Sequence, residues 1–347
     1  MVNRVRAILF EVETACCLEC NYCYNAWKAV DGYPKGRLST RKTIRALRKL
    51  MRESGATQLA CTGGEPLLRD DLPDIVAAMT LAGTTVSVLT NGRLLTPDWA
   101  QDLKRTGVKL VQLTLLSMNP EVHDAHCGAG AFGDIMKAAQ ILKQTGIPLA
   151  ITVVVTNKTL DELPELMTYM KSIGQTTFLL NRYNPGGNLV KKGEQQDYME
   201  LMMSKEDTQR MLQHAEDGAR KLGMRPVVAV PIPMCVVDRS AYPAVQFAGC
   251  AASTDNAYFT MDPLGNIRMC NHSPVILGNI LKDSFLDIAN GPEAEKWLTV
   301  KPDECKPCPA WDQCKAGCRA VAQQMGQDLT VLDPYVAHNV DFSKMKV

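Results

Sequence analysis

The chain has 347 residues and a net charge of +1, with 38 basic and 37 acidic side chains spread along it. This balance excludes a strongly basic nucleic-acid-binding protein and a polybasic membrane anchor. Because single hydrophobic cores stop growing at about 250–300 residues, the length predicts one large domain and a smaller one.

The amino terminus leads directly into a strand-like apolar segment, without the apolar core of a signal peptide. No apolar run reaches the roughly 18 residues that a membrane-spanning helix needs. We therefore expect a cytoplasmic protein that binds neither membranes nor nucleic acids. Thirteen cysteines in a reducing compartment, clustered at fixed spacings, favour metal ligation over a disulfide framework.

Short β-branched runs alternate with helix-period segments over residues 5–180. The predicted strands are 7–12, 58–62, 85–90, 110–115, 149–155 and 177–180. The segments between them carry helix boundaries, such as Ser39 before the first helix and Gly55 after it. Six βα repeats in succession predict an α/β fold, in which a parallel sheet curls into a partial (β/α)6 TIM-like barrel. Functional side chains are then expected at the carboxyl ends of the strands.

The pattern changes after residue 182, where a Pro-Gly-Gly stretch predicts a loop. Ser204 is expected to cap one more helix, which ends near Gly223. Prolines and cysteines increase beyond it, and residues 258–261 and 267–270 predict a β-hairpin. We therefore predict a barrel domain over residues 1–223 and a small cysteine-rich α+β domain over residues 224–347.

Directly after the first predicted strand, Cys16, Cys20 and Cys23 form a C-x3-C-x2-C loop. Three thiolates at this spacing can hold three irons of a 4Fe–4S cubane and leave the fourth iron without a protein ligand. An open iron at the carboxyl end of a barrel strand is a site for chemistry. Cys17 falls outside the spacing, and we expect it to pack as a small apolar side chain.

This loop and its position resemble the radical S-adenosylmethionine (SAM) superfamily. The resemblance implies that Cys16, Cys20 and Cys23 are the catalytic cysteines and that the open iron chelates the amino and carboxylate groups of SAM. One electron from the reduced cluster then breaks a sulfur–carbon bond of SAM. The usual result is a 5′-deoxyadenosyl radical that takes hydrogen from the substrate.

Further residues match the family and are implied contacts of SAM. Tyr22 is implied to lie against adenine, and Gly63-Gly64-Glu65 to receive the methionine ammonium group. Thr90 and Asn91, at the end of the third strand, are implied to contact the ribose. Each also has a simpler interpretation, namely packing for Tyr22 and ordinary turns for the other two segments.

The chain departs from the family after the fourth strand, where relatives often have Ser-x-Asp-Gly and this chain has Ser117-Met118-Asn119-Pro120. We still expect Ser117 to reach the ribose. Arg182, at the end of the sixth strand, is expected to pair with the carboxylate of SAM, and a solvated surface arginine is the alternative. We expect His126 to lie in a surface loop and Cys127 to be packed.

The second predicted domain carries cysteines at the spacings Cys250-x14-Gly265-x4-Cys270 and Cys305-x2-Cys308-x5-Cys314-x3-Cys318. This pattern resembles the SPASM domain, an extension of radical SAM enzymes that usually binds two auxiliary 4Fe–4S clusters. A zinc ribbon is the alternative, because C-x2-C pairs also suit tetrahedral zinc.

The resemblance implies two ligand sets. Cys250, Cys270 and Cys318 are expected to hold the first auxiliary cluster, with Cys235 as the candidate fourth ligand. Cys305, Cys308 and Cys314 are expected to hold the second cluster, whose usual last cysteine is missing because none follows Cys318.

The fourth iron of the second auxiliary cluster therefore needs a different ligand. Asp333 and His338 lie in about the right stretch to replace the missing cysteine. An exogenous ligand would also complete the cluster, and the iron could equally stay open. A degenerate site that binds no stable cluster is a further interpretation of the same spacing.

SPASM-bearing relatives mostly modify ribosomally made peptides or protein side chains. The resemblance therefore implies a radical SAM oxidoreductase or maturase that oxidises or crosslinks a peptide, with flavodoxin or ferredoxin as electron donor. Because the first strand begins almost at Met1, a winged-helix peptide-recognition domain is not expected before it. Recognition of a leader peptide would then need a separate partner protein.

Two further functions belong to different classes. One is a radical SAM enzyme that acts on a small molecule in a natural-product or modified-haem pathway, including one that transfers a carbon group of SAM. The second is a non-catalytic iron–sulfur protein that carries electrons.

Overall fold

The computed structural model describes residues 5–191, 199–253 and 257–344. Within these ranges, eleven strands form one sheet in the order β11-β10-β9-β1-β2-β3-β4-β5-β6-β7-β8. The strands are β1 (Ala7–Glu13), β2 (Gln58–Gly63), β3 (Thr85–Leu89), β4 (Leu110–Thr114), β5 (Leu149–Val155), β6 (Thr177–Arg182), β7 (Arg225–Val228), β8 (Gln246–Phe247), β9 (Tyr258–Met261), β10 (Asn266–Arg268) and β11 (Ile276–Asn279).

The α-helices are α1 (Ala26–Ala29), α2 (Thr40–Ser54), α3 (Leu72–Thr80), α4 (Pro97–Arg105), α5 (Pro120–Cys127), α6 (Ala131–Thr145), α7 (Leu163–Ser172), α8 (Gly187–Lys191), α10 (Lys205–Leu222), α11 (Phe285–Ala289), α12 (Pro292–Thr299), α13 (Trp311–Cys314), α14 (Ala320–Gln324) and α15 (Pro334–Asn339). Short 3-10 helices are η1 (Pro66–Leu68), η2 (Leu160–Glu162), η3 (Arg239–Ala241), η4 (Ala251–Ser253), η5 (Asp303–Cys305) and η6 (Phe342–Lys344).

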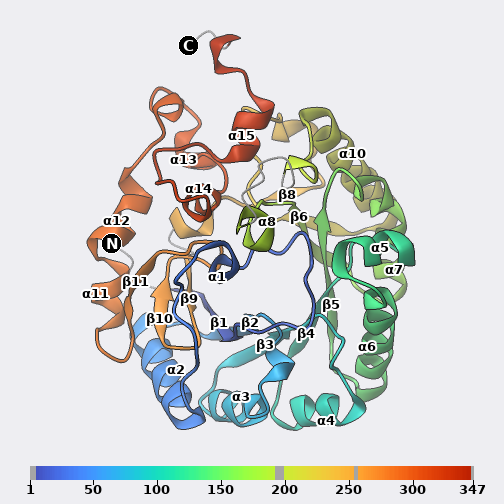
Figure 1. Ribbon diagram of the computed structural model, residues 1–347. Coiled ribbons are helices and arrows are strands. Elements are labelled where there is room, and N and C mark those ends of the chain that lie inside the picture. The colour runs from blue at the N-terminus through green and yellow to red at the C-terminus, as the bar shows by residue number, and fades with distance from the viewer. Residues whose placement is uncertain (1–4, 192–198, 254–256, 345–347) are drawn as a thin grey trace.

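Strands β1 to β6 are parallel, and each pairs with the next along the chain. Figure 1 looks into the open ring that these strands form, with the helices α2, α3, α4, α6 and α7 on its outside. This is the α/β fold with a partial TIM-like barrel that the sequence predicts. The predicted ends of the six strands agree with the observed ones to within two residues.

The sheet continues on both sides of these six strands. Beyond residue 223, β7 pairs in parallel with β6, and β8 pairs with β7. On the other side, β9 pairs in parallel with β1, and β9 and β10 form the predicted antiparallel hairpin. Figure 1 shows this orange hairpin beside the blue β1. The boundary predicted between residues 223 and 224 therefore falls within a continuous sheet.

Alternate side chains of the parallel strands form the core. Ile8 of β1, Leu59 of β2 and Val86 of β3 lie in register and are buried. They belong to one continuous apolar cluster with Leu50 of α2 and Ile75 of α3. Since successive side chains of a strand point to opposite faces, this alternation fixes the register of the sheet and the level at which every strand ends.

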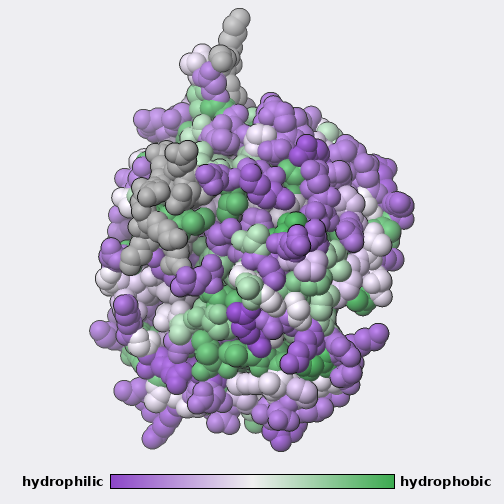
Figure 2. Space-filling view, turned by 45° about the vertical axis from the view of Figure 1, so that its right-hand side comes forward, coloured by the Kyte–Doolittle hydropathy of each residue, from purple (hydrophilic) through white to green (hydrophobic). Residues whose placement is uncertain are grey.

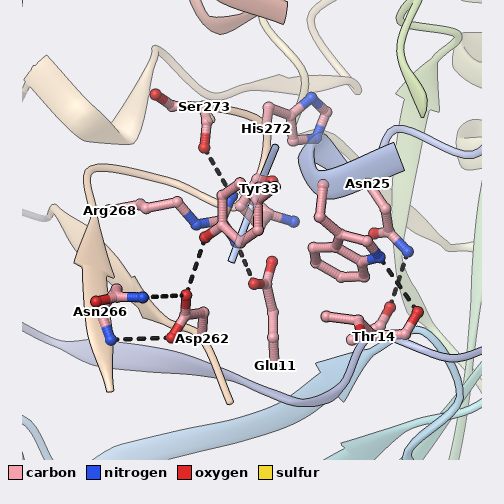
Figure 3. A network of polar contacts seen from close by, with 12 residues as sticks. Glu11, Thr14, Asn25, Tyr33, Asp262, Asn266, Arg268, His272 and Ser273 are labelled. Carbon is pink, nitrogen blue, oxygen red and sulfur yellow. Dashed lines mark hydrogen bonds and ion pairs between the residues drawn. The ribbon is translucent and has the colours of Figure 1, made fainter. Parts of the chain in front are cut away.

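A buried polar side chain of β1 joins the barrel to the hairpin. Glu11 forms an ion pair with Arg268 of β10, and both side chains are buried. Arg268 also donates to the backbone oxygen of Ser273 at 2.6 Å. Tyr33 covers the pair, and its hydroxyl donates to Asp262 at 3.1 Å (Figure 3). The hairpin is thus attached to β1 by backbone pairing and by charge.

Most of the face shown in Figure 2 carries polar side chains, with apolar ones gathered toward its lower centre. The long helix α10 has the predicted bounds: a capping box of Ser204 and Asp207 starts it, and Gly223 ends it. Among the described helices, none combines the length and the apolar character that crossing a membrane requires.

Replacing Arg268 with methionine is expected to lower the free energy of unfolding by about 3–5 kcal/mol, because Glu11 would stay buried without its partner. Denaturant unfolding followed by circular dichroism measures the loss. The double variant Glu11→Leu, Arg268→Met is the control and is expected to recover most of the stability, since no buried charge is left. A double variant as unstable as the single one would contradict this explanation.

Candidate active site and cluster-binding cysteines

The first cysteine loop lies at the rim of the barrel. Cys16, Cys20 and Cys23 all fall between the end of β1 and the start of α1. The Cys23 amide donates to the Cys20 carbonyl at 3.2 Å, which closes a turn. Asn21 holds the loop against α5, because its amide donates to the His126 carbonyl at 3.0 Å and its side-chain oxygen lies 2.9 Å from Nδ1 of His126. The loop therefore stands at the carboxyl edge of the sheet, where we expect chemistry.

Two glycines let the chain before Cys16 pass close to the end of β2. A Cβ on Gly63 would lie 2.5 Å from the Glu13 carbonyl oxygen, and one on Gly64 would lie 2.0 Å from that of Ala15. Neither distance is tolerable, so only glycine fits at these positions. The Gly64 amide donates to the Glu13 carbonyl at 2.7 Å. The two glycines thus attach the cysteine loop to the neighbouring strand.

Glu65 links the ends of β2 and β3 through hydrogen bonds. It is fully buried, and its carboxylate accepts hydrogen bonds from the Thr90 hydroxyl at 2.6 Å and the Asn91 amide at 2.9 Å. Burial raises the pKa of Glu65, and these hydrogen bonds act in the opposite direction. The Asn91 side chain in turn donates to the Cys17 sulfur at 3.4 Å. These residues position the cysteine loop, and their contacts with SAM stay predictions.

Tyr22 belongs to the same loop and packs against the end of α5. The Cys127 thiol donates to its hydroxyl at 3.7 Å, and the Cys20 thiol donates to the Cys127 carbonyl at 3.9 Å. The predicted packing of Cys127 is confirmed, because it belongs to a small buried cluster with Leu116. Our prediction that His126 lies in a surface loop is wrong, because this residue is buried in the last turn of α5. The contact of Tyr22 with adenine stays a prediction.

Ser117 follows β4 at the same rim and is fully buried. Its hydroxyl donates to Glu162 at 2.7 Å and accepts from the Asn119 amide at 2.8 Å. Its predicted contact with ribose is not tested by this arrangement. Glu162, at the end of η2, is a carboxylate at the same rim that the sequence motifs did not identify. Its position shortly after the fifth predicted strand is the signal that could have identified it.

Arg182 does not have the role that we expected. Its side chain is buried and forms an ion pair with Asp333. It also donates to the Asn184 side chain at 2.6 Å and to the Pro231 carbonyl at 3.0 Å, and its guanidinium lies 4.2 Å above the centre of the Tyr335 ring. Neither pairing with SAM nor a solvated surface position fits these contacts. Its ion-pair partner, Asp333, lies 151 residues further along the chain, so the sequence around Arg182 gave no sign of it.

Asp333 is committed to the same network. Besides Arg182, its carboxylate accepts from the Cys318 amide at 2.8 Å and the Tyr335 amide at 3.0 Å. It therefore supports the loop of Cys318 and does not replace the missing ligand of the second cluster. His338, the other candidate, is exposed near the end of α15.

Cys250, Cys270 and Cys318 come together beside the hairpin. Burial raises the pKa of Cys270 to about 12, and the nearby Cys250 thiol adds to the rise. Burial also raises the pKa of Cys318, with Asp333, Cys270 and Cys250 contributing. These three thiols are the ones predicted for the first auxiliary cluster, and the structure brings them together without Cys235.

Cys235 lies instead with Cys305, Cys308 and Cys314. These four residues line one cavity of about 500 Å³. Burial raises the pKa of Cys305 to about 12, and the neighbouring Cys314, Cys235 and Cys308 thiols add to the rise. Our grouping of Cys235 with the first auxiliary cluster is therefore wrong. The spacing in the sequence could not show this, because Cys235 stands outside the repeated pattern.

The donors in all three groups are thiols, which suit iron–sulfur clusters. Across residues 5–191, 199–253 and 257–344, no three histidine, cysteine or acidic side chains converge closely enough to hold a single metal ion. The second auxiliary group surrounds a cavity, and a cubane is bound in this manner by thiolates around its perimeter. Cysteine ligation of each cluster stays a prediction.

Comparison with known families agrees with this arrangement. The sequence profile described as the radical SAM superfamily matches residues 11–170, which run from the end of β1 through β5 and include the first cysteine loop. A second profile, the SPASM iron–sulfur cluster-binding domain, matches residues 250–315. The chain belongs to the radical SAM superfamily and carries a SPASM domain. It is an enzyme, and its cofactors are 4Fe–4S clusters and SAM.

Two curated relatives of this radical SAM protein span almost its whole length. The AdoMet-dependent heme synthase of Methanosarcina barkeri is 26% identical, over 96% of this chain and 97% of the relative. The PqqA peptide cyclase of Granulibacter bethesdensis is 25% identical, over 95% of this chain and 86% of the relative.

Solved structures show the same fold. One is anSMEcpe with bound AdoMet, with a TM-score of 0.71, 18% identity and coverage of 96% of this chain and 93% of the other. SuiB of Streptococcus suis bound to its precursor peptide SuiA has a TM-score of 0.72 and 16% identity, over 95% of this chain and 75% of the other. The fold is thus shared over nearly the whole of this chain.

Replacing Gly64 with alanine is expected to displace the segment before Cys16, because the new Cβ would meet the Ala15 carbonyl. We expect a lower melting temperature and less iron per chain after anaerobic reconstitution. Gly133→Ala in α6 is the matched control: its Cβ meets nothing within 4 Å, and a helix-interior alanine is expected to add about 0.5–1 kcal/mol of stability. Equal iron content in the two variants would contradict the positioning role.

Replacing Arg182 with methionine tests its role in the ion pair. We expect the free energy of unfolding to fall by about 3–5 kcal/mol, because Asp333 would remain buried and unpaired. The dissociation constant for SAM, measured by isothermal titration calorimetry on the reconstituted protein, is expected to stay unchanged. A loss of SAM affinity at full stability would instead support direct pairing of Arg182 with SAM.

Proposed function

We propose that this enzyme reductively cleaves SAM at the barrel rim and uses the resulting radical chemistry to oxidise or crosslink a peptide substrate. When bound, the cluster and SAM supply one-electron cleavage and abstraction of a hydrogen atom. The observation that carries the proposal is the position of Cys16, Cys20 and Cys23 directly after β1, beside the glycine pair and Glu65 at the ends of neighbouring strands.

The chain's own residues would prepare this reaction in three ways. Gly63 and Gly64 allow the close approach that sets the position of the cysteine loop. Glu65, held by Thr90 and Asn91, keeps the strand ends together. Cys16, Cys20 and Cys23 would hold three irons and leave the fourth open to the amino and carboxylate groups of SAM.

Relatives of the chain support a peptide substrate. The PqqA peptide cyclase of Granulibacter bethesdensis covers most of the sequence, and SuiB was solved with its precursor peptide. The auxiliary clusters of this chain's SPASM domain would accept the electron that remains after hydrogen is removed. We propose flavodoxin or ferredoxin as the donor to the first cluster and a separate protein for recognition of a leader peptide.

A small-molecule substrate is the second candidate. It is favoured by the AdoMet-dependent heme synthase of Methanosarcina barkeri, which matches this chain over 97% of its own length. The reaction would again begin with cleavage of SAM and would take a porphyrin in place of a peptide.

Replacing Cys20 with alanine is expected to abolish formation of 5′-deoxyadenosine from SAM by the dithionite-reduced protein, because the cluster would lose one of three ligands. Liquid chromatography with mass spectrometry measures the product. Cys17→Ala, in the same loop but outside the ligand spacing, is the matched control and is expected to retain the activity. An inert wild-type protein with full iron content would indicate an electron carrier instead.

The class of substrate is tested by parallel incubations with candidate peptides and porphyrins. The reduced enzyme with SAM is incubated with the products of short open reading frames near its gene and, in parallel, with iron-free and iron-containing porphyrins. We expect a mass change in a peptide, equal to loss of hydrogens or formation of a crosslink. A mass change in a porphyrin, with every peptide unchanged, would support the second candidate.

A further inference from the structure

The segment that carries Cys235 connects the barrel to the SPASM part and is held from two sides. The Arg182 side chain donates to the Pro231 carbonyl at 3.0 Å, and the Arg239 side chain donates to the Ile232 carbonyl at 3.1 Å. The Val236 amide closes a turn by donating to the carbonyl of Pro233 at 3.0 Å. These hydrogen bonds therefore fix the backbone around Cys235.

This turn presents Cys235 to a cavity that three other cysteines line. The cavity of about 500 Å³ is bounded by Cys235, Cys305, Cys308 and Cys314 and is completed by apolar side chains such as Trp311. The Cys314 and Cys308 thiols lie near enough to Cys235 to interact with it electrostatically. Apolar walls limit access of water to a bound cluster, which tunes its potential.

The backbone between Cys314 and Cys318 separates the two auxiliary groups. Lys315, Ala316 and Gly317 have φ values of 55°, 61° and 78°, in the left-handed region that non-glycine residues rarely adopt. Strain of this kind persists only where the surrounding structure enforces it. On one side of these three residues Cys314 lines the cavity with Cys235, and on the other side Cys318 lies near Cys250 and Cys270.

We propose that Cys235 is the fourth thiolate ligand of the second auxiliary cluster, together with Cys305, Cys308 and Cys314. A ligand from the connection before the SPASM domain thus replaces the cysteine that is missing after Cys318. The first auxiliary cluster then keeps three cysteines, Cys250, Cys270 and Cys318, and one iron without a cysteine ligand. This inference rests on the auxiliary clusters of the proposed function and does not depend on the substrate.

Alkylation of the intact holoenzyme is the first test. Cys235 is exposed, so a free thiol at this position would react with iodoacetamide in the folded protein. We expect no alkylation of Cys235 in the anaerobically reconstituted enzyme and complete alkylation after iron is removed with a chelator, as read by peptide mass spectrometry. Alkylation of Cys235 in protein with three full clusters would overturn the proposal.

Substitution is the second test. In the full-length enzyme, Cys235→Ala is expected to lose about four irons per chain, or about one if a 3Fe–4S cluster remains, with a matching change in the Mössbauer spectrum. Met234→Ala, the adjacent residue in the wall of the same cavity, is the matched control and is expected to keep the full content. Unchanged iron and an unchanged spectrum in Cys235→Ala would also overturn the proposal.

The two tests separate this inference from the proposed function. Loss of 5′-deoxyadenosine formation reports on the SAM cluster, whereas the protection of Cys235 and the iron content report on the second auxiliary site. If Cys235→Ala does not fold, the alkylation result on the unaltered enzyme still decides.

Discussion

The buried ion pair between Arg182 and Asp333 is the interaction on which the arrangement of the auxiliary cysteines depends. Separating two charges at fully buried positions would leave each without compensation, so the pair must stay intact. Arg182 ends β6 and also binds the carbonyl of Pro231, four residues before Cys235, while Asp333 accepts from the amide of Cys318. One contact therefore holds a cysteine from each auxiliary group against the barrel.

The buried ion pair between Glu11 and Arg268 also attaches the SPASM part to the barrel, in this case at β1. It joins β1, which leads into the first cysteine loop, to the hairpin that precedes Cys270. Together the two ion pairs attach the SPASM part to both sides of a single sheet. The fold thus holds thiols from distant segments in position, and fixed positions matter because radical and electron-transfer steps depend on geometry.

Much of the fold followed from local patterns. The alternation of β-branched runs and helix-period segments placed the six parallel strands to within two residues, and the Ser204 cap and Gly223 bounded α10 correctly. These features were predictable because hydrophobic periodicity and capping are local in the chain. The role of β9 as a neighbour of β1 was not, since strand pairing between distant segments leaves no local signal.

Residue spacing alone predicted the three-cysteine loop, the glycine pair beside it and the family, because each depends on a short stretch of chain that the backbone must arrange locally. The neighbours of Arg182 and Cys235 could be found only in the folded chain. The buried Arg182 pairs with a carboxylate from a distant segment, because the fold brings Asp333 next to it. Cys235 likewise lies in a cavity with three cysteines that are distant in the sequence. Spacing predicts ligands within one segment, but contacts between segments decide which cluster they share.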